Sequence, residues 1–139
     1  MSTPPSEFLR LRLRRDPSAP GLAREALEQL ALEELHLTGA LHDDALLVAS
    51  ELATNAVAQP TAEPDGEIEL VADLVDDGLR LAVTDCCIQR QDAPFGLRRA
   101  DDLGPDGFDG LGLRIIQALS RRWGTERLDG RRMWAVLSI

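Results

Sequence analysis

A carboxylate and a carboxamide lie four residues apart in the stretch Ser50 to Ala56, which reads SELATNA. On an α-helix this spacing puts Glu51 and Asn55 on one face, one turn apart. Oxygen groups of these two types suit a hydrated Mg²⁺, and such a carboxylate can also act as a general base or orient a nucleophile. The alternative is a surface acid and a helix-interior amide without a chemical role, because such pairs are common by chance.

Two further features follow along the chain. Asp85 stands where a strand pattern ends, and a carboxylate there can accept a hydrogen bond from an exocyclic amine such as that of adenine. Gly110 and Gly112 stand where an irregular segment gives way to a helix pattern, so their backbone N–H groups can approach a phosphate at a helix N-terminus. Taken singly, an Asp after a strand more often caps a turn, and two spaced glycines are a weak signal that also fits a tight loop exit. In this order, the features indicate a site that holds a base at one end and phosphates at the other.

Helices must carry most of these groups. Apolar residues around Glu51 and Asn55 recur in steps of three and four, which predicts a helix docked on a core, with the pair at the border of its buried stripe. Two more helices are expected, over residues 16–37 and over residues 110–123. Gly124 would then form the C-terminal cap of the last helix.

Alternation of apolar and polar residues predicts the strands. Residues 8–15 place leucines on one side and arginines on the other, which is either a solubilising device of an edge strand or a contact for an acidic partner. Residues 67–75 and 79–85 form a hairpin, and residues 125–139 form another. The element order predicts an α+β fold, a two-layer sandwich with the helices on one face of a mixed, mainly antiparallel sheet.

The composition limits the function. The 139 residues suit one domain, here residues 8–139 after a flexible tail of residues 1–7. The net charge of -9 disfavours direct binding to nucleic acid, and the absence of lysine excludes a P-loop site and Schiff-base chemistry. No apolar run approaches the roughly 20 residues of a membrane helix, and no secretion signal is seen, so we expect a cytoplasmic protein without membrane contact.

The motifs together resemble the GHKL ATPase superfamily, which includes gyrase and the histidine kinases, over about residues 8–139. Within it, the chain is similar to the small single-domain anti-sigma factor and serine-protein kinase branch of bacteria. The motifs that carry the resemblance are ALLVASELATNAV (45–57, N box), LRLAVTDCC (79–87, G1 box), DGLGLRIIQALSRRWG (109–124, G2 box) and GRRMWAVL (130–137, closing hairpin).

The resemblance implies a Bergerat-type site for ATP and Mg²⁺. Asn55 would ligate the Mg²⁺, Glu51 would be the catalytic base, and Asp85 would receive the adenine amine. Residues 88–109 would form a lid over the ATP. The nucleotide-binding residues implied in this way are Asn55, Asp85, Cys87, Gly110, Leu111, Gly112 and Leu113.

The same branch implies an anti-sigma factor with serine/threonine-protein kinase activity toward an anti-sigma antagonist. Its partners would be a sigma factor, the antagonist or both, and a homodimer is a candidate state. Two motif positions depart from the family pattern: Cys87 stands where the G1 box usually has glycine, and Leu111 stands where a basic or polar residue is common. The alternative is therefore a degenerate, non-catalytic module of the same fold that acts by protein–protein binding.

Overall fold

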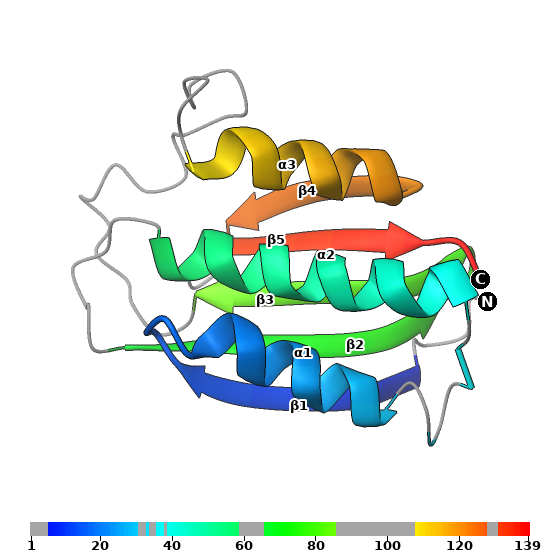
Figure 1. Cartoon of the computed structure of the whole chain (residues 1–139), viewed down its shortest axis with the longest axis horizontal. Helices are drawn as coiled ribbons and strands as arrows, with labels where there is room; N and C mark the ends of the chain where they lie inside the picture. Colours follow the sequence, from blue (N-terminus) through cyan, green and yellow to red (C-terminus); the bar gives the residue numbers. More distant parts are fainter. Residues whose placement is uncertain are drawn as a thin grey trace.

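The computed structural model describes residues 6–30, 33, 36–37, 39–58, 66–85, 108–127 and 131–139, with the backbone alone at 6, 108–111 and 127. In this part of the chain, helices lie over one face of a single sheet (Figure 1). The elements are β1 (Ser6–Arg14), α1 (Ala19–Leu30), α2 (Gly39–Ala58), β2 (Glu67–Val75), β3 (Gly78–Asp85), α3 (Phe108–Leu119), β4 (Arg122–Arg127) and β5 (Arg131–Leu137).

The strands form one sheet in the order β1-β2-β3-β5-β4. Its inner face is apolar because every second residue of a strand points the same way. In β2 and β3 the buried residues on that face are Ile68, Leu70, Ala72, Leu79, Leu81 and Val83. The predicted α+β two-layer sandwich is confirmed. The sheet was predicted to be mixed and mainly antiparallel, and the described pairings are all antiparallel.

Helix α2 is the centre of the helical layer. It lies between α1 and α3 (Figure 1) and also packs on β2, β3 and β5. A helix with neighbours on three sides needs a buried face wider than one stripe, and small side chains let those neighbours come close. Its buried residues are Ala45, Val48, Ala49, Leu52, Ala53, Asn55 and Ala56. Among the described helices, none is both long and apolar enough to cross a membrane.

Helix α1 begins after a turn that the sequence marks clearly. The Ser18 carbonyl accepts the N–H of Leu22 at 3.1 Å, so Ser18 is the N-cap residue. The Ser18 N–H in turn donates to Asp16 Oδ1 at 2.8 Å. The helix is described as far as Leu30, and most of the predicted continuation toward Leu37 lies outside the described residues.

The predicted end of the last helix is wrong. α3 ends at Leu119, and Trp123 lies in β4, where it pairs with Ala135. The change of structure occurs at Arg121, whose N–H donates to the Val136 carbonyl of β5 at 2.8 Å. A step of four residues from one apolar side chain to the next fits a helix, but it fits equally a tight turn into a strand with the same inner face.

Gly124 is therefore not a helix cap. It lies in β4 opposite Trp134, and an added Cβ would lie 2.9 Å from Cζ2 of that indole ring. The guanidinium of Arg122 also lies over this ring, 5.4 Å from its centroid. Glycine at this position makes room for a large aromatic side chain on the open face of the sheet.

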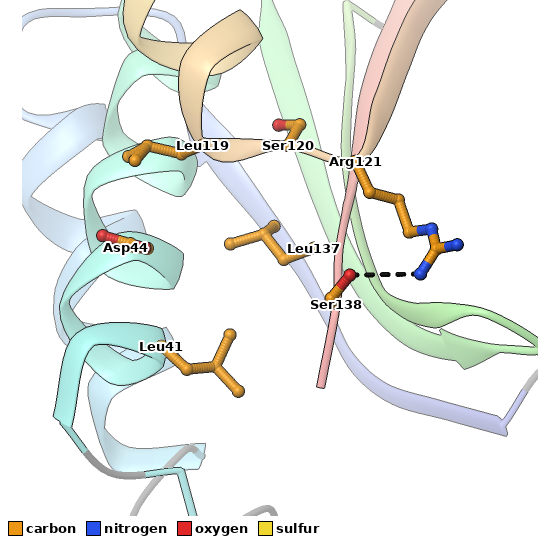
Figure 2. Close-up of a pocket in the computed structure, with 7 residues that line it drawn as sticks. All are labelled: Leu41, Asp44, Leu119, Ser120, Arg121, Leu137 and Ser138. Atoms are coloured by element: carbon orange, nitrogen blue, oxygen red, sulfur yellow. Dashed lines mark hydrogen bonds between the residues drawn. The ribbon is translucent and has the colours of Figure 1, made fainter.

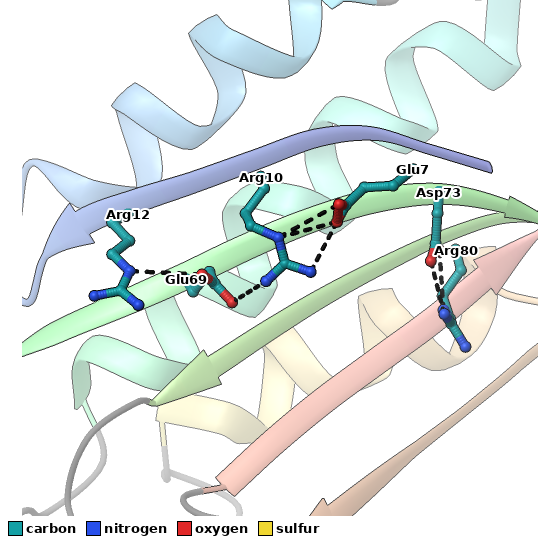
Figure 3. Close-up of polar contacts among 6 residues, drawn as sticks. All are labelled: Glu7, Arg10, Arg12, Glu69, Asp73 and Arg80. Carbon is teal, nitrogen blue, oxygen red and sulfur yellow. Dashed lines mark hydrogen bonds and ion pairs between the residues drawn. The ribbon is translucent and has the colours of Figure 1, made fainter. Parts of the chain in front are cut away.

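The open face of the sheet carries paired charges (Figure 3). On the edge strand β1, Arg10 lies 2.8 Å from Glu7 and 2.7 Å from Glu69, measured between nitrogen and oxygen. Farther along, Arg80 makes two hydrogen bonds to Asp73, of 3.0 and 2.7 Å. Because Glu7 of β1 and Glu69 of β2 already neutralise the charge of Arg10, the contacts favour the edge-strand interpretation of the arginine row.

Asp77, in the turn between β2 and β3, gives a test of this surface electrostatics. Hydrogen bonds from Arg122 lower its pKa from 3.8 to about 2, with Arg121 also 3.4 Å away. A carboxylate with a lowered pKa stabilises the fold above its unfolded pKa and loses that effect as the pH falls through the folded pKa. We expect Asp77→Asn to lower the melting temperature slightly at neutral pH, and the difference from wild type to close between about pH 4 and about pH 2. Thermal denaturation across that range measures it, with the exposed Asp76→Asn as control; a gap independent of pH would contradict the prediction.

Candidate functional site

The four segments that carry the predicted site meet at one end of the sandwich. α2 and β3 end there, and α3 and β5 begin there, as Figure 1 shows. In the sheet, Asp85 at the end of β3 lies directly opposite Arg131 at the start of β5. Side chains from elements far apart in the sequence are thus brought to a common region.

Glu51 and Gly112 are in direct contact there. An ideal Cβ built on Gly112 would lie 2.5 Å from Glu51 Oε1, so the half-buried carboxylate of α2 rests against the bare Cα of α3. A side chain at this position would have to displace the carboxylate, which is the flexible end of Glu51. The acid of the N box and the second glycine of the G2 box are therefore neighbours in space.

Asn55 is anchored on the sheet. Its side chain is buried, with the residue 8% exposed, and Nδ2 donates to the Met133 sulfur at 2.7 Å. A thioether is a weak acceptor that cannot donate, so the contact turns the amide nitrogen toward the sheet and orients the carboxamide. Met133 pairs with Val83, two residues before Asp85 on the same face of the sheet. Asn55 thus lies one turn of α2 beyond Glu51 and over the strands that lead to Asp85.

Asp85 lies on the inner face of the sheet and forms an ion pair with Arg15. The pair is nearly enclosed, because the side chains are 3% exposed for Arg15 and 12% exposed for Asp85. The other terminal nitrogen, Nη1 of Arg15, donates to the carbonyl of Ala56 at 2.8 Å. This carbonyl belongs to the last turn of α2, where the negative end of the helix dipole favours a cation. Arg15 therefore connects Asp85 to the helical turn that carries Asn55.

Arg15 is not among the site residues predicted above, although the sequence holds a signal for it. In the alternating stretch Leu9 to Arg15, the inward positions are odd-numbered, and Arg15 falls on an inward position directly after the outward Arg14. Asp85 falls on the inward side of its own strand by the same count. Two inward charges of opposite sign at the ends of strands in one sheet, here β1 and β3 with β2 between them, favour a buried pair.

The structure describes the remaining predicted site residues only in part. Because α3 begins at Phe108, Gly110 lies inside its first turn instead of leading into it, and the N–H groups of that turn have no partner within the helix. Leu113 is half-buried and packs against the core. Cys87, the side chain of Leu111 and most of the predicted lid lie outside the described residues.

A cavity of about 350 Å³ lies at the other end of the molecule (Figure 2). It opens between Leu41 and Asp44 of α2 and the segment of Ser120 and Arg121, and Arg121 Nη1 donates to the Ser138 hydroxyl at 3.2 Å. Asn55 is eleven residues beyond Asp44 along α2, which corresponds to roughly 16 Å of helix. This cavity is therefore separate from the candidate site.

Comparison with protein families decides the assignment. The model of the histidine kinase-like ATPase domain matches residues 13–138. The chain belongs to this family. The GHKL resemblance is thus confirmed at the level of the superfamily, and the N, G1 and G2 boxes all lie inside the matched range. No curated protein matches the chain.

For this histidine kinase-like ATPase domain, Gly112 gives a test that separates function from stability. Alanine is the better helix former by up to about 1 kcal/mol, and the group it would displace is the flexible end of Glu51. We expect Gly112→Ala to keep or raise the free energy of unfolding while it moves the Glu51 carboxylate and weakens ATP binding. Urea denaturation and a nucleotide assay on the same variant measure both effects.

Gly21→Ala is the matched control, because an added Cβ at this helical glycine meets nothing within 4 Å. It should keep or raise the free energy of unfolding for the same reason, and it should leave ATP binding close to wild type. If Gly112→Ala unfolded the domain, the expected stability would be wrong. If it bound ATP as well as Gly21→Ala does, the close approach of Glu51 would have no role in nucleotide binding.

Proposed function

We propose that this chain binds ATP with Mg²⁺ and acts as an anti-sigma factor with serine/threonine-protein kinase activity toward an anti-sigma antagonist. The observation that carries the proposal is the contact between Glu51 and Gly112. It puts a carboxylate beside the first turns of α3, where backbone N–H groups without a partner in the helix and the helix dipole favour phosphate. A base next to a phosphate site is what phosphoryl transfer to a hydroxyl requires.

The residues present fit ATP and Mg²⁺ by their donor chemistry. Glu51 and Asn55 offer oxygen atoms of the kind that Mg²⁺ prefers, one helical turn apart on α2. Asn55 would hold the Mg²⁺, whose charge would offset that of the triphosphate. At the other end of the site, Asp85 offers an acceptor to the adenine amine, because a carboxylate has room for more than one hydrogen bond.

The proposed reaction is a direct transfer. As the hydroxyl oxygen of the acceptor serine or threonine bonds to the γ-phosphorus, the bond from that phosphorus to the bridging oxygen breaks and ADP leaves. Glu51 accepts the hydroxyl proton in this step. The N–H groups at the start of α3 stabilise the charge on the transferring group.

Asn55→Ala tests the nucleotide site. We expect it to abolish Mg²⁺-dependent ATP binding while the domain stays folded, because alanine is the better helix former and the apolar packing of α2 is kept. Isothermal titration with Mg-ATP measures the binding, and circular dichroism checks the fold. Gln117→Ala, which removes an exposed carboxamide from α3, is the control and should bind like wild type.

Glu51→Gln tests the transfer step. The substitution keeps the size of the side chain but removes the base, so ATP affinity should be retained while phosphorylation of the antagonist slows by about 10²–10⁴-fold. The acceptor is captured from the native cell with and without ATP and assayed with γ-labelled ATP. Transfer at the wild-type rate by Glu51→Gln would remove this residue from the mechanism.

The second candidate is the non-catalytic binding module. It is favoured by the Arg15 ion pair, which already gives Asp85 a protein partner, together with Cys87 at the glycine position of the G1 box. In that case wild type gives no heat with Mg-ATP, the partner is captured equally well without nucleotide, and Cys87→Gly strengthens ATP binding. Phosphate transfer by the wild type would exclude it.

A further inference from the structure

Arg15 is a buried cation at the base end of the proposed nucleotide site. Its side chain is 3% exposed and pairs with Asp85, the residue that would meet the adenine amine. A charge enclosed to this degree is tolerated when an opposite charge and hydrogen-bond acceptors compensate it. Here the compensation comes from a carboxylate on β3 and a backbone carbonyl on α2, so one side chain joins two sides of the site.

The geometry of Arg15 matters as much as its charge. One terminal nitrogen meets Asp85 Oδ1, while the other donates to the Ala56 carbonyl at 2.8 Å. The planar guanidinium holds these two nitrogens in a fixed fork, which the single ammonium of lysine cannot reproduce. Since the carbonyl belongs to α2, the fork holds one oxygen of the Asp85 carboxylate in place relative to that helix.

Arg15 is also held from its backbone. Its N–H donates to the Gly66 carbonyl at 3.0 Å, immediately before β2. In the sheet, Leu13 pairs with Ile68, and Ile68 pairs with Asp85, so these three inward residues form one row across β1, β2 and β3. Arg15 lies two residues beyond that row on the same face. A long side chain from this position reaches the carboxylate across the intervening strand.

We propose that Arg15 is a positioning residue that selects the base, because it holds Asp85 as a hydrogen-bond acceptor for the 6-amino group of adenine. This inference rests on the proposed ATP site. A carboxylate oriented in this way accepts from a 6-amino purine but meets the lone pairs of a 6-oxo purine, which lacks that donor. Sites built to bond a donor discriminate strongly against analogues that lack it.

Inosine triphosphate is the probe for this role. It carries an oxygen in place of the 6-amino group and the same triphosphate as ATP, so the ratio of the two dissociation constants isolates the base end of the site. We expect Arg15→Met to reduce the preference for ATP over inosine triphosphate by about tenfold or more, as expected for one hydrogen bond to a charged group. Arg15→Lys should give a smaller reduction, because it keeps the charge without the fork.

Two variants separate positioning from a merely structural role. Arg14→Met, the neighbouring arginine on the exposed side of β1, should leave the ratio unchanged. In an Asp85→Asn background, Arg15→Lys should have no further effect on the ratio, because Arg15 acts through Asp85. An Arg15 variant that weakens both nucleotides equally and keeps the ratio would overturn the inference.

The outcomes distinguish the inference from the proposed function. If wild type binds neither nucleotide, the proposed function fails and the inference fails with it. If wild type prefers ATP and Arg15→Lys keeps that preference in full, the inference alone fails. Should Arg15→Met not fold, as circular dichroism would show, the ratio measured with Arg15→Lys decides the question.

Discussion

The burial of α2 between two helices and the sheet is the constraint on which the rest of the structure depends. Its buried face is wide and rich in alanine, so α1, α3 and the inner face of the sheet all come close to it. Glu51 and Asn55 lie in the C-terminal half of this packed helix, one toward α3 and the other toward β5. Because α2 packs against so many neighbours, moving it would cost free energy. Glu51 and Asn55 are therefore held in place with the helix.

The ion pair of Arg15 and Asp85 adds a second constraint at the same end. The pair links the ends of β1 and β3, and the bond to Ala56 ties both to α2. Burying two charges is costly, and a pair in such a place is weak evidence for stability. The pair lies beside the proposed adenine site. There a carboxylate held in place can accept a hydrogen bond from the base, which an apolar residue could not do.

Local apolar patterns predicted the elements correctly where one face of an element meets the core. They failed to predict where α3 ends. The hairpin of β2 and β3 follows the predicted alternation because its inner face is buried along its length. After Leu119 the apolar spacing continues to Trp123, yet the chain has already turned into a strand. Two contacts to β5 decide this turn: Arg121 with Val136, and Gly124 with the Trp134 ring. The local apolar pattern contains no information about either contact.

The sequence by itself determined the α+β fold, the pairing of Glu51 with Asn55 on one helix, and the inward side of Asp85. It also contained the inward side of Arg15, since period two in a strand and 3.6 in a helix assign every residue to a face. What only the tertiary structure decided is which faces meet: Glu51 against Gly112, and Arg15 between Asp85 and Ala56. These contacts join residues 41 to 70 positions apart, and a periodic pattern gives the direction of a side chain but not its distance from a partner on another element.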